Sequence, residues 1–238
     1  FSRQSKGLPI VNLLQIDQDE AVKSIIKLEK DDSHKYLIFA TKKGIVKRTL
    51  ISDFDNIRAT GKICISLKEN DKLIAVRKTN GDNEILMGSG IGRMVKFNEK
   101  DVRVMGRTAA GVRGINLGSA ECIGMEVANS EQEILIVTEN GYGKKTKVDD
   151  FRLSKRGGKG VKALSITEKN GFISSFKISL NEHDLMVITN TGTLIRMSLD
   201  QIATIGRVTQ GVKLINLKNN QKVATVAVVE KFEDQSEA

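Results

Sequence analysis

A basic residue recurs at a fixed distance from four evenly spaced glycines. The glycines lie 48, 49 and 51 residues apart, each after a short apolar run, and they are Gly44, Gly92, Gly141 and Gly192. Four residues after each glycine stands a base: Arg48, Lys96, Lys145 and Arg196. Lys and Arg bind phosphate oxygens through charge-assisted hydrogen bonds, and a neighbouring glycine lets a phosphate approach backbone N–H groups. The pattern therefore predicts a row of phosphate contacts, and the alternative is a set of outward-facing strand residues.

A second motif, Arg-x-x-x-Gly followed by an apolar strand, recurs in the same frame. Its copies are Arg3 to Gly7, Arg107 to Gly111, Arg156 to Gly160 and Arg207 to Gly211, with a looser copy at Gly61. The densest basic cluster lies in one copy, at Lys155-Arg156-Gly157-Gly158-Lys159-Gly160. A Gly-Gly pair flanked by bases is suited to clamp a phosphate, and the alternative is a basic flexible turn.

Further bases lie beside the two motifs. The residues that we expect to contact a phosphate backbone are Lys47, Arg48, Arg93, Lys96, Arg107, Arg113, Lys144, Lys145, Lys155, Arg156, Gly157, Gly158, Lys159, Gly160, Arg196, Arg207 and Lys213, and Lys162 lies in the same clusters. A net charge of +9 and a pI near 9.5 favour a polyanionic partner. Aromatic residues make up only 4%, which argues against base stacking on single strands and favours duplex contact and bending with little base readout.

Each catalytic or cofactor-binding candidate fails in its context. Gly88-Ser-Gly-Ile-Gly92 lies between two predicted strands with no following helix, so a nucleotide-binding loop is not predicted. Gly143-Lys-Lys-Thr146 lacks the earlier glycine of a P-loop. His34 and His183 have no second ligand nearby. We therefore expect no catalytic centre, no cofactor and no metal site in this chain.

Composition predicts the compartment. Cys64 and Cys122 match no metal or redox spacing and fit a small core position in a reducing cytoplasm. No apolar run approaches the roughly 18–20 residues of a membrane helix, so we expect no membrane contact.

The repeats predict an all-β disc. Each unit of about 50 residues holds four short Val-, Ile- and Leu-rich segments separated by turns such as Asn80-Gly81 and Asn140-Gly141. Four strands per repeat are typical of propeller blades. We predict one domain over 1–238 with about five four-stranded blades: a partial blade at 1–35, repeats at 36–83, 84–132, 133–183 and 184–233, and a short acidic tail at 230–238 that either competes with DNA or is a solvated terminus.

These motifs resemble the C-terminal domain family of the DNA gyrase A subunit. Ser154-Lys-Arg-Gly-Gly-Lys-Gly160 is similar to the family's box Gln-Arg-Arg-Gly-Gly-Lys-Gly, with Ser154 and Lys155 as departures. Gly106-Arg-Thr-Ala-Ala-Gly-Val-Arg-Gly-Ile115 and Val137-Thr-Glu-Asn-Gly-Tyr-Gly-Lys144 also resemble it, and the likeness covers roughly residues 2 to 229.

The resemblance implies a β-pinwheel, in which neighbouring blades exchange a strand and duplex DNA wraps around a basic rim. It implies that the wrap lets gyrase introduce negative supercoils, in an A2B2 assembly with the gyrase B subunit that also contains the rest of the gyrase A subunit. ATP and Mg²⁺ would act elsewhere in that enzyme, which would be cytoplasmic, bacterial and associated with the nucleoid.

Two departures from the family and three alternatives stay open at this point. The family's principal box lies in the first blade, whereas the cluster at 154–160 corresponds to a secondary copy in a later blade. The family usually has six blades, whereas this chain has material for about five. The alternatives are a propeller scaffold for protein partners, an enzyme with a polar funnel on its axis, and the C-terminal domain of the topoisomerase IV A subunit.

Overall fold

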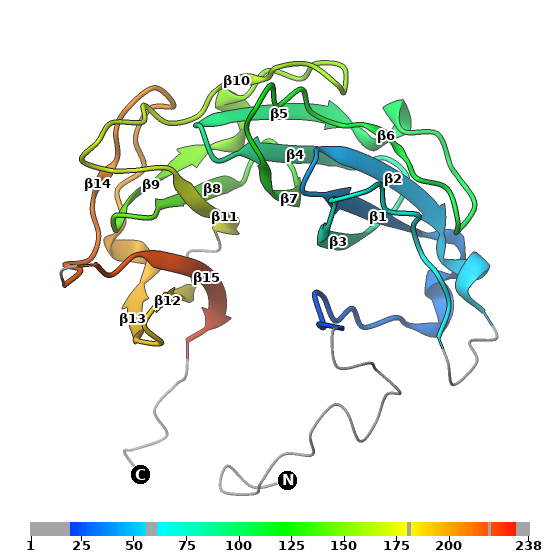
Figure 1. Ribbon diagram of the computed structural model, residues 1–238, viewed down its shortest axis with the longest axis horizontal. Helices are drawn as coiled ribbons and strands as arrows, with labels where there is room; N and C mark the ends of the chain where they lie inside the picture. The colour runs from blue at the N-terminus through cyan, green and yellow to red at the C-terminus, as the bar shows by residue number, and fades with distance from the viewer. Residues whose placement is uncertain (1–19, 56–60, 180–181, 219, 232–238) are drawn as a thin grey trace, which may run out of the picture.

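Four β-sheets follow one another along an open arc (Figure 1). The computed structural model describes residues 20–55, 61–179, 182–218 and 220–231. Blade 1 contains β1 (Tyr36–Thr41), β2 (Ile45–Leu50) and β3 (Leu73–Thr79). Blade 2 contains β4 (Glu84–Ser89), β5 (Arg93–Asn98) and β7 (Cys122–Ala128). Blade 3 contains β8 (Glu133–Thr138), β9 (Tyr142–Lys147) and β11 (Ile173–Ser179), and blade 4 contains β12 (His183–Thr189), β13 (Leu194–Ser198) and β15 (Val223–Glu230).

Each of the first three blades is completed by a strand from the following repeat. The exchanged strands are β6 (Val112–Arg113), β10 (Val161–Lys162) and β14 (Val212–Lys213), which pair antiparallel with β2, β5 and β9. The sheet orders are therefore β3-β1-β2-β6, β10-β5-β4-β7 and β11-β8-β9-β14. Within the described residues blade 4 has three strands, β13-β12-β15.

Side-chain alternation along the strands builds the core between blades. Ile38 and Ala40 of β1 pack in one buried cluster with Ile85 and Met87 of β4. The intervening Leu86 faces the other way, into the cluster between blades 2 and 3. Because both faces of a blade are apolar, a blade is stable only against its neighbours.

Short 3-10 turns connect the blade elements. They are η2 (Lys30–His34), η3 (Ile51–Phe54), η4 (Glu99–Asp101), η5 (Val148–Asp150) and η6 (Leu199–Gln201). The last four each follow the second strand of a blade directly and begin with a buried residue.

The glycine of the first motif serves the strand exchange. Gly44, Gly92 and Gly141 have φ values of +77°, +83° and +80°. A Cβ on Gly92 would lie 2.6 Å from the carbonyl oxygen of Leu164, in the segment that follows exchanged strand β10. The Gly92 carbonyl also accepts the N–H of Ala163 at 2.8 Å. The expectation that this space admits a phosphate is therefore wrong, because protein backbone fills it.

The predicted architecture is confirmed as all-β and propeller-like, and the number of blades is corrected. The described residues form four blades, whereas about five were predicted. Residues 20–29 belong to the predicted partial blade and form no strand. The motif copy from Arg3 to Gly7 and most of the predicted acidic tail, from 232 onward, lie outside the described residues.

Candidate nucleic-acid interface

The bases that follow the motif glycines by four residues are mostly buried. Arg48, Lys96 and Lys145 are 7%, 3% and 6% exposed. Each contacts a carboxylate, with Arg48 to Glu99 at 3.4 Å, Lys96 to Glu84 at 3.3 Å and Lys145 to Glu133 at 3.4 Å. Their backbones form parallel bridges to Val104, Leu153 and Thr204 of the next repeat. These three bases do not form the predicted row of exposed phosphate contacts, because the next repeat covers them.

Arg196 is the exposed member of the same series. Its Nε donates to Asp184 Oδ2 at 2.6 Å. It lies on β13 of blade 4, and within the described part of the chain no exchanged strand pairs with β13. The difference from the other three bases follows from that missing cover.

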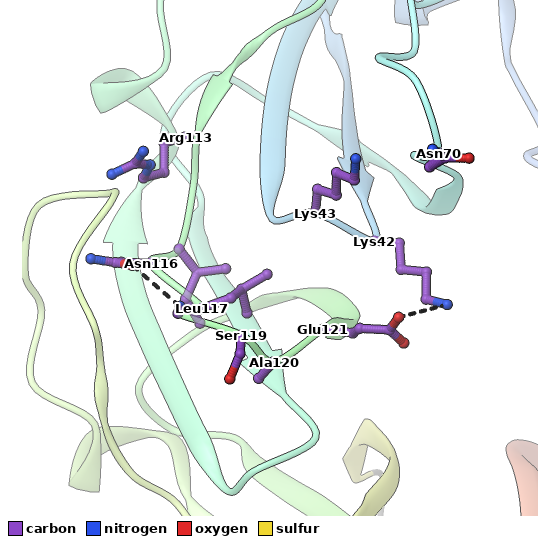
Figure 2. Close-up of a pocket in the computed structure, with 11 residues that line it drawn as sticks. Lys42, Lys43, Asn70, Arg113, Asn116, Leu117, Ser119, Ala120 and Glu121 are labelled. Carbon is purple, nitrogen blue, oxygen red and sulfur yellow. Dashed lines mark hydrogen bonds and ion pairs between the residues drawn. The ribbon is translucent and has the colours of Figure 1, made fainter.

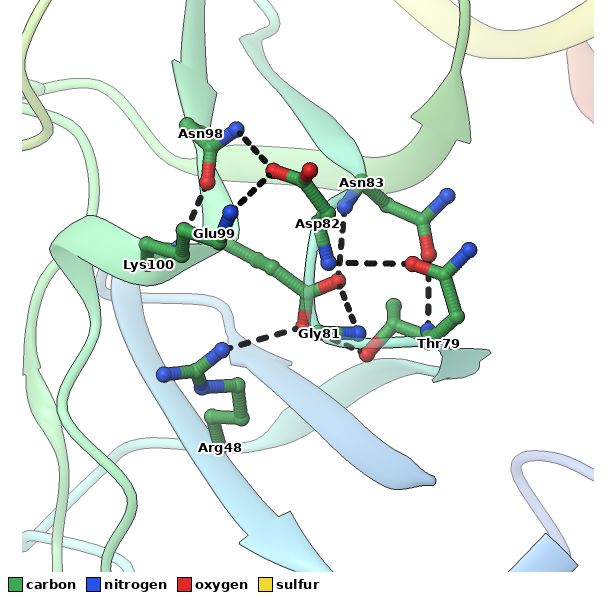
Figure 3. A network of polar contacts seen from close by, with 9 residues as sticks. Arg48, Thr79, Gly81, Asp82, Asn83, Asn98, Glu99 and Lys100 are labelled. Atoms are coloured by element: carbon green, nitrogen blue, oxygen red, sulfur yellow. Dashed lines mark hydrogen bonds and ion pairs between the residues drawn. The ribbon is translucent and has the colours of Figure 1, made fainter. Parts of the chain in front are cut away.

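Glu99 organises a buried polar network that sequence reasoning missed (Figure 3). Its Oε1 accepts the N–H groups of Gly81 at 2.9 Å and Asn83 at 2.8 Å. Its Oε2 accepts the Thr79 hydroxyl at 2.7 Å and Arg48 at 3.4 Å. The equivalent first residues of the other 3-10 turns are Ile51, Val148 and Leu199. The carboxylate in an otherwise apolar position was the available signal.

Lys47 and Lys144 are also buried, and each is 0% exposed. The Lys144 Nζ donates to the carbonyls of Gly206 at 2.8 Å and Arg207 at 2.7 Å. The Lys47 Nζ donates to the carbonyls of Cys64 and Arg107. Burial lowers the pKa of each amine to about 8. Because protein carbonyl groups surround both amines, they are not available for the predicted phosphate contact.

Exposed bases occupy the exchanged strands. The second residue of β6, β10 and β14 is Arg113, Lys162 and Lys213, and all three are exposed. These strands lie along the outer side of the arc, whereas β3, β7, β11 and β15 lie on its inner side (Figure 1). One base per exchanged strand therefore follows the outer edge of blades 1 to 3, which we call the rim.

The Arg-x-x-x-Gly loops lie against these exchanged strands. Arg156 donates from Nε to the Asp101 carbonyl at 2.8 Å and from a terminal nitrogen to the Arg113 carbonyl at 3.0 Å. Arg207 likewise donates to the Lys162 carbonyl. The three motif arginines Arg107, Arg156 and Arg207 are half-buried. Arg156 and Arg207 each connect their loop to the exchanged strand of the preceding blade, β6 and β10 respectively.

The Gly-Gly cluster combines exposed bases with a held backbone. Lys155 and Lys159 are exposed. Gly157, at φ +80°, donates its N–H to the Gly114 carbonyl at 2.6 Å. Gly160, at φ +68°, passes so close to β5 that a Cβ would lie 2.2 Å from the Met94 carbonyl oxygen. Gly158 is exposed, and a Cβ there would meet only the Lys155 carbonyl oxygen at 3.8 Å and the Gly160 nitrogen at 3.9 Å.

A polar hollow of about 450 Å³ lies beside β6 (Figure 2). Lys42, Lys43 and Arg113 line it together with Asn116 and Glu121. Lys42 contacts Glu121 at 2.8 Å, and Lys43 donates to the Glu69 carbonyl at 2.6 Å. The exposed Arg93 donates similarly to the Gly160 carbonyl at 3.0 Å. The hollow lies between the turn that joins β1 to β2 and the segment that follows β6.

Metal ligands and membrane spans were both expected to be absent. Among the described residues no group of three or more His, Cys, Asp or Glu side chains could hold a metal ion. In the same part of the chain no helix has the length and apolar character needed to cross a membrane.

Sequence comparisons match the chain to known proteins. A family model described as "DNA gyrase C-terminal domain, beta-propeller" matches residues 35–80, 83–129, 132–179 and 183–230. The DNA gyrase A subunit of Staphylococcus epidermidis is 48% identical over 238 residues, which cover 98% of this chain and 27% of that protein. The corresponding protein of Staphylococcus aureus strain MRSA252 is 48% identical over 241 residues, covering 99% and 27%. The chain thus spans about a quarter of these relatives.

Structural comparisons agree. The C-terminal domain of DNA topoisomerase IV superposes with a TM-score of 0.87 at 27% identity, covering 94% of this chain and 71% of that one. The DNA gyrase A C-terminal domain superposes with a TM-score of 0.82 at 24% identity, covering 95% and 76%. At 24% identity, the match to the gyrase A domain supports the propeller-like fold alone.

Fold and surface together define a strand-exchanged β-propeller with bases along its outer rim. The sequence matches narrow that class, and the chain belongs to the DNA gyrase C-terminal domain family.

Proposed function

We propose that this chain binds and bends duplex DNA around the rim without reading its sequence. The observation that supports the proposal is the exposed base at the second position of β6, β10 and β14, in three consecutive blades of an arc. A curved row of cations matches the phosphate row on the inner face of a bent duplex. Lys155, Lys159 and Arg93 add charge next to that row.

The energetics require several distributed contacts. Bending a site of 20–30 base pairs costs on the order of 1–6 kcal/mol. Phosphate contacts by Lys and Arg release counterions and offset that cost. Buried Lys47, Arg48, Lys96, Lys144 and Lys145 are excluded from the contact set, because their amines or guanidinium already bind protein groups.

Within a gyrase, this wrapping would direct strand passage toward negative supercoils. The partners would be the gyrase B subunit, together with the remainder of the gyrase A subunit, in an A2B2 assembly that holds the catalytic residues, ATP and Mg²⁺. The chain itself would be non-catalytic and free of cofactors. A cytoplasmic location at the bacterial nucleoid belongs to the same proposal.

The likeness to the topoisomerase IV domain supports a second candidate, in which the blades hold DNA without constraining a wrap. A ligation assay on nicked circular DNA separates the two. Wrapping shifts the linking number of the closed product in proportion to bound protein, whereas simple binding leaves it unchanged.

The first prediction tests the rim by charge removal. If about eight phosphates are neutralised, log K for duplex binding should fall with log salt at a slope near −7. We expect Arg113→Ala/Lys162→Ala/Lys213→Ala to reduce that slope by about 3 units, since each phosphate contributes about 0.9. Fluorescence anisotropy with duplexes of two unrelated sequences measures both slope and sequence dependence.

The matched control removes three exposed bases away from the rim. Lys23 lines a second hollow, which lies at the inner strands β3, β7 and β11, and Lys222 and Lys231 flank β15. Lys23→Ala/Lys222→Ala/Lys231→Ala lowers the net charge equally and should keep the wild-type slope. Equal slopes for the two triple variants, or a wild-type slope near zero, contradict the proposal.

A further inference from the structure

Two of the Arg-x-x-x-Gly loops are held from inside by a lysine, and the third is not. The relevant position is three residues after each motif glycine, on the second strand of the blade: Lys47, Val95, Lys144 and Ile195 in blades 1 to 4. The strand register places them equivalently, opposite Phe39, Met87, Ile136 and Val187.

Each lysine donates to the carbonyl oxygen of the equivalent arginine in the next repeat. The Lys47 Nζ donates to the carbonyl of Arg107, and the Lys144 Nζ donates to the carbonyl of Arg207 at 2.7 Å. Arg107 and Arg207 are the equivalent arginines of two Arg-x-x-x-Gly loops. Lys144 also donates to the Gly206 carbonyl at 2.8 Å and the Thr209 hydroxyl at 3.1 Å. Each ammonium thus turns peptide carbonyls of its loop inward.

The Gly-Gly loop uses a different device in blade 2. Val95 has no donor, and the turn residue Gly157 instead donates its backbone N–H to Gly114 at 2.6 Å. The Gly114 carbonyl is equivalent to the Cys64 carbonyl that Lys47 contacts in blade 1. A cavity of about 180 Å³ remains between Val95 and this loop. A buried lysine in blades 1 and 3 and a backbone hydrogen bond in blade 2 thus each fix the conformation of an Arg-x-x-x-Gly loop.

We propose that Lys47 and Lys144 are positioning residues that fix the loops 107–111 and 207–211 for contact with DNA phosphates. This rests on the proposed function. With their carbonyls directed to the buried amine, the loops keep their arginines beside the exchanged strands, where Arg207 already contacts the Lys162 carbonyl. The lysines act through the loops and do not touch DNA.

Limited trypsin digestion of the folded 238-residue chain tests the holding role directly. Trypsin cleaves at the carbonyl of arginine, which is the group that each lysine binds. Lys144→Met should accelerate cleavage of the Arg207–Val208 bond about tenfold, which corresponds to about 1.4 kcal/mol, the order of one hydrogen bond from a charged group. Lys47→Met should do the same at Arg107–Thr108, and each variant should leave the other loop unchanged.

The Arg156–Gly157 bond is the internal control, because neither lysine contacts its loop. Thr209→Val, at an exposed position, leaves the lysine unaltered and removes its contact with the Thr209 hydroxyl, together with the bond of that hydroxyl to the Gly206 carbonyl at 2.9 Å. It should give a smaller acceleration at Arg207–Val208 alone. This variant keeps the test decisive if Lys144→Met fails to fold.

Binding to a random-sequence duplex gives the second readout. Lys144→Met should weaken affinity about threefold to tenfold at a temperature where its circular dichroism equals that of the wild type. Faster cleavage at all three bonds, no acceleration, or selective acceleration with unchanged affinity each overturns the positioning role. Failure of the wild type to bind duplex DNA instead refutes the proposed function on which it rests.

Discussion

Single residues decide where charge can act in this molecule. Lys47 and Lys144 have their ammonium groups withdrawn from water and surrounded by carbonyl oxygens. Their pKa of about 8 is well below that of a lysine in an unfolded chain, which is about 10.4. Between these pH values the unfolded chain binds more protons than the folded one, so the free energy of unfolding rises with pH.

The second prediction follows from that sign. Between about pH 8 and 10 each of the two lysines should contribute up to about 1.4 kcal/mol per pH unit to the rise in unfolding free energy. Lys47→Met/Lys144→Met should lack this contribution. Urea unfolding at pH 7.5 and 9.5 measures both proteins, with Lys222→Met as the exposed control. Parallel pH dependences of wild type and double variant would show that burial does not perturb these amines.

Residue types alone could predict basic contacts but not which bases are exposed. Arg48, Lys96 and Lys145 recur in frame because each forms a buried ion pair with a glutamate. The next repeat covers all three bases. Spacing along one strand does not reveal a cover that arrives from a segment tens of residues away. Arg113 and Lys213 were predicted because they follow a motif glycine, and the structure places both on the exposed edge.

At the scale of elements, the exchanged strand explains the motif glycines. The two-residue strand β10 pairs with β5 through Val161 opposite Met94 and Lys162 opposite Arg93, directly after Gly160. Gly160 permits this pairing, because its φ of +68° suits glycine and no room exists for a Cβ beside Met94. The same sequence motif therefore encodes blade assembly as well as a basic loop.

The third prediction compares two glycines of one cluster. Gly160→Ala should destabilise the domain by at least about 1–2 kcal/mol from the left-handed conformation alone, and by more if β10 leaves β5. A Cβ on Gly158 would make only ordinary van der Waals contacts, at 3.8 Å or more, and this glycine has no positive φ. Gly158→Ala should therefore change stability by less than about 0.5 kcal/mol. Thermal unfolding of both variants measures the difference. Equal losses would mean that the cluster is held by contacts other than the β10 crossing.

The repeat length and the strands were predictable because turn glycines and apolar runs have strong local patterns. The number of blades was not predictable, because a copy of the motif can occur without a complete blade around it. Gly61 begins a copy whose residues form no strand in the structure. The partner of an exchanged strand lies in another repeat, and that long-range pairing is absent from any local pattern.

For the whole molecule, the arc would determine how many contacts one duplex makes at once under the proposed function. Blades 1 to 3 present their exchanged strands along the same outer side (Figure 1). Contacts on a common curve add up only if DNA bends to follow it. The basic cluster of blade 2 lies in the middle of this series and should influence the bend most.

The fourth prediction concerns that cluster. Lys155→Ala/Lys159→Ala removes two exposed bases and leaves Arg156, which holds the loop through Asp101 and Arg113. We expect a smaller linking-number shift in the ligation assay and an unchanged melting temperature. The double variant Lys222→Ala/Lys231→Ala is the charge-matched control. A full shift with normal stability would exclude these two lysines from the wrap.

Strand exchange also constrains how the chain can fold as the ribosome produces it. Val46 pairs with Val112, which is synthesised 66 residues later. Blade 1 therefore stays incomplete until most of the next repeat has left the exit tunnel, and each later blade waits in the same way. Folding should advance from the N-terminal side with a lag of more than one repeat, and the nascent edge of β2 needs protection from other chains during that interval.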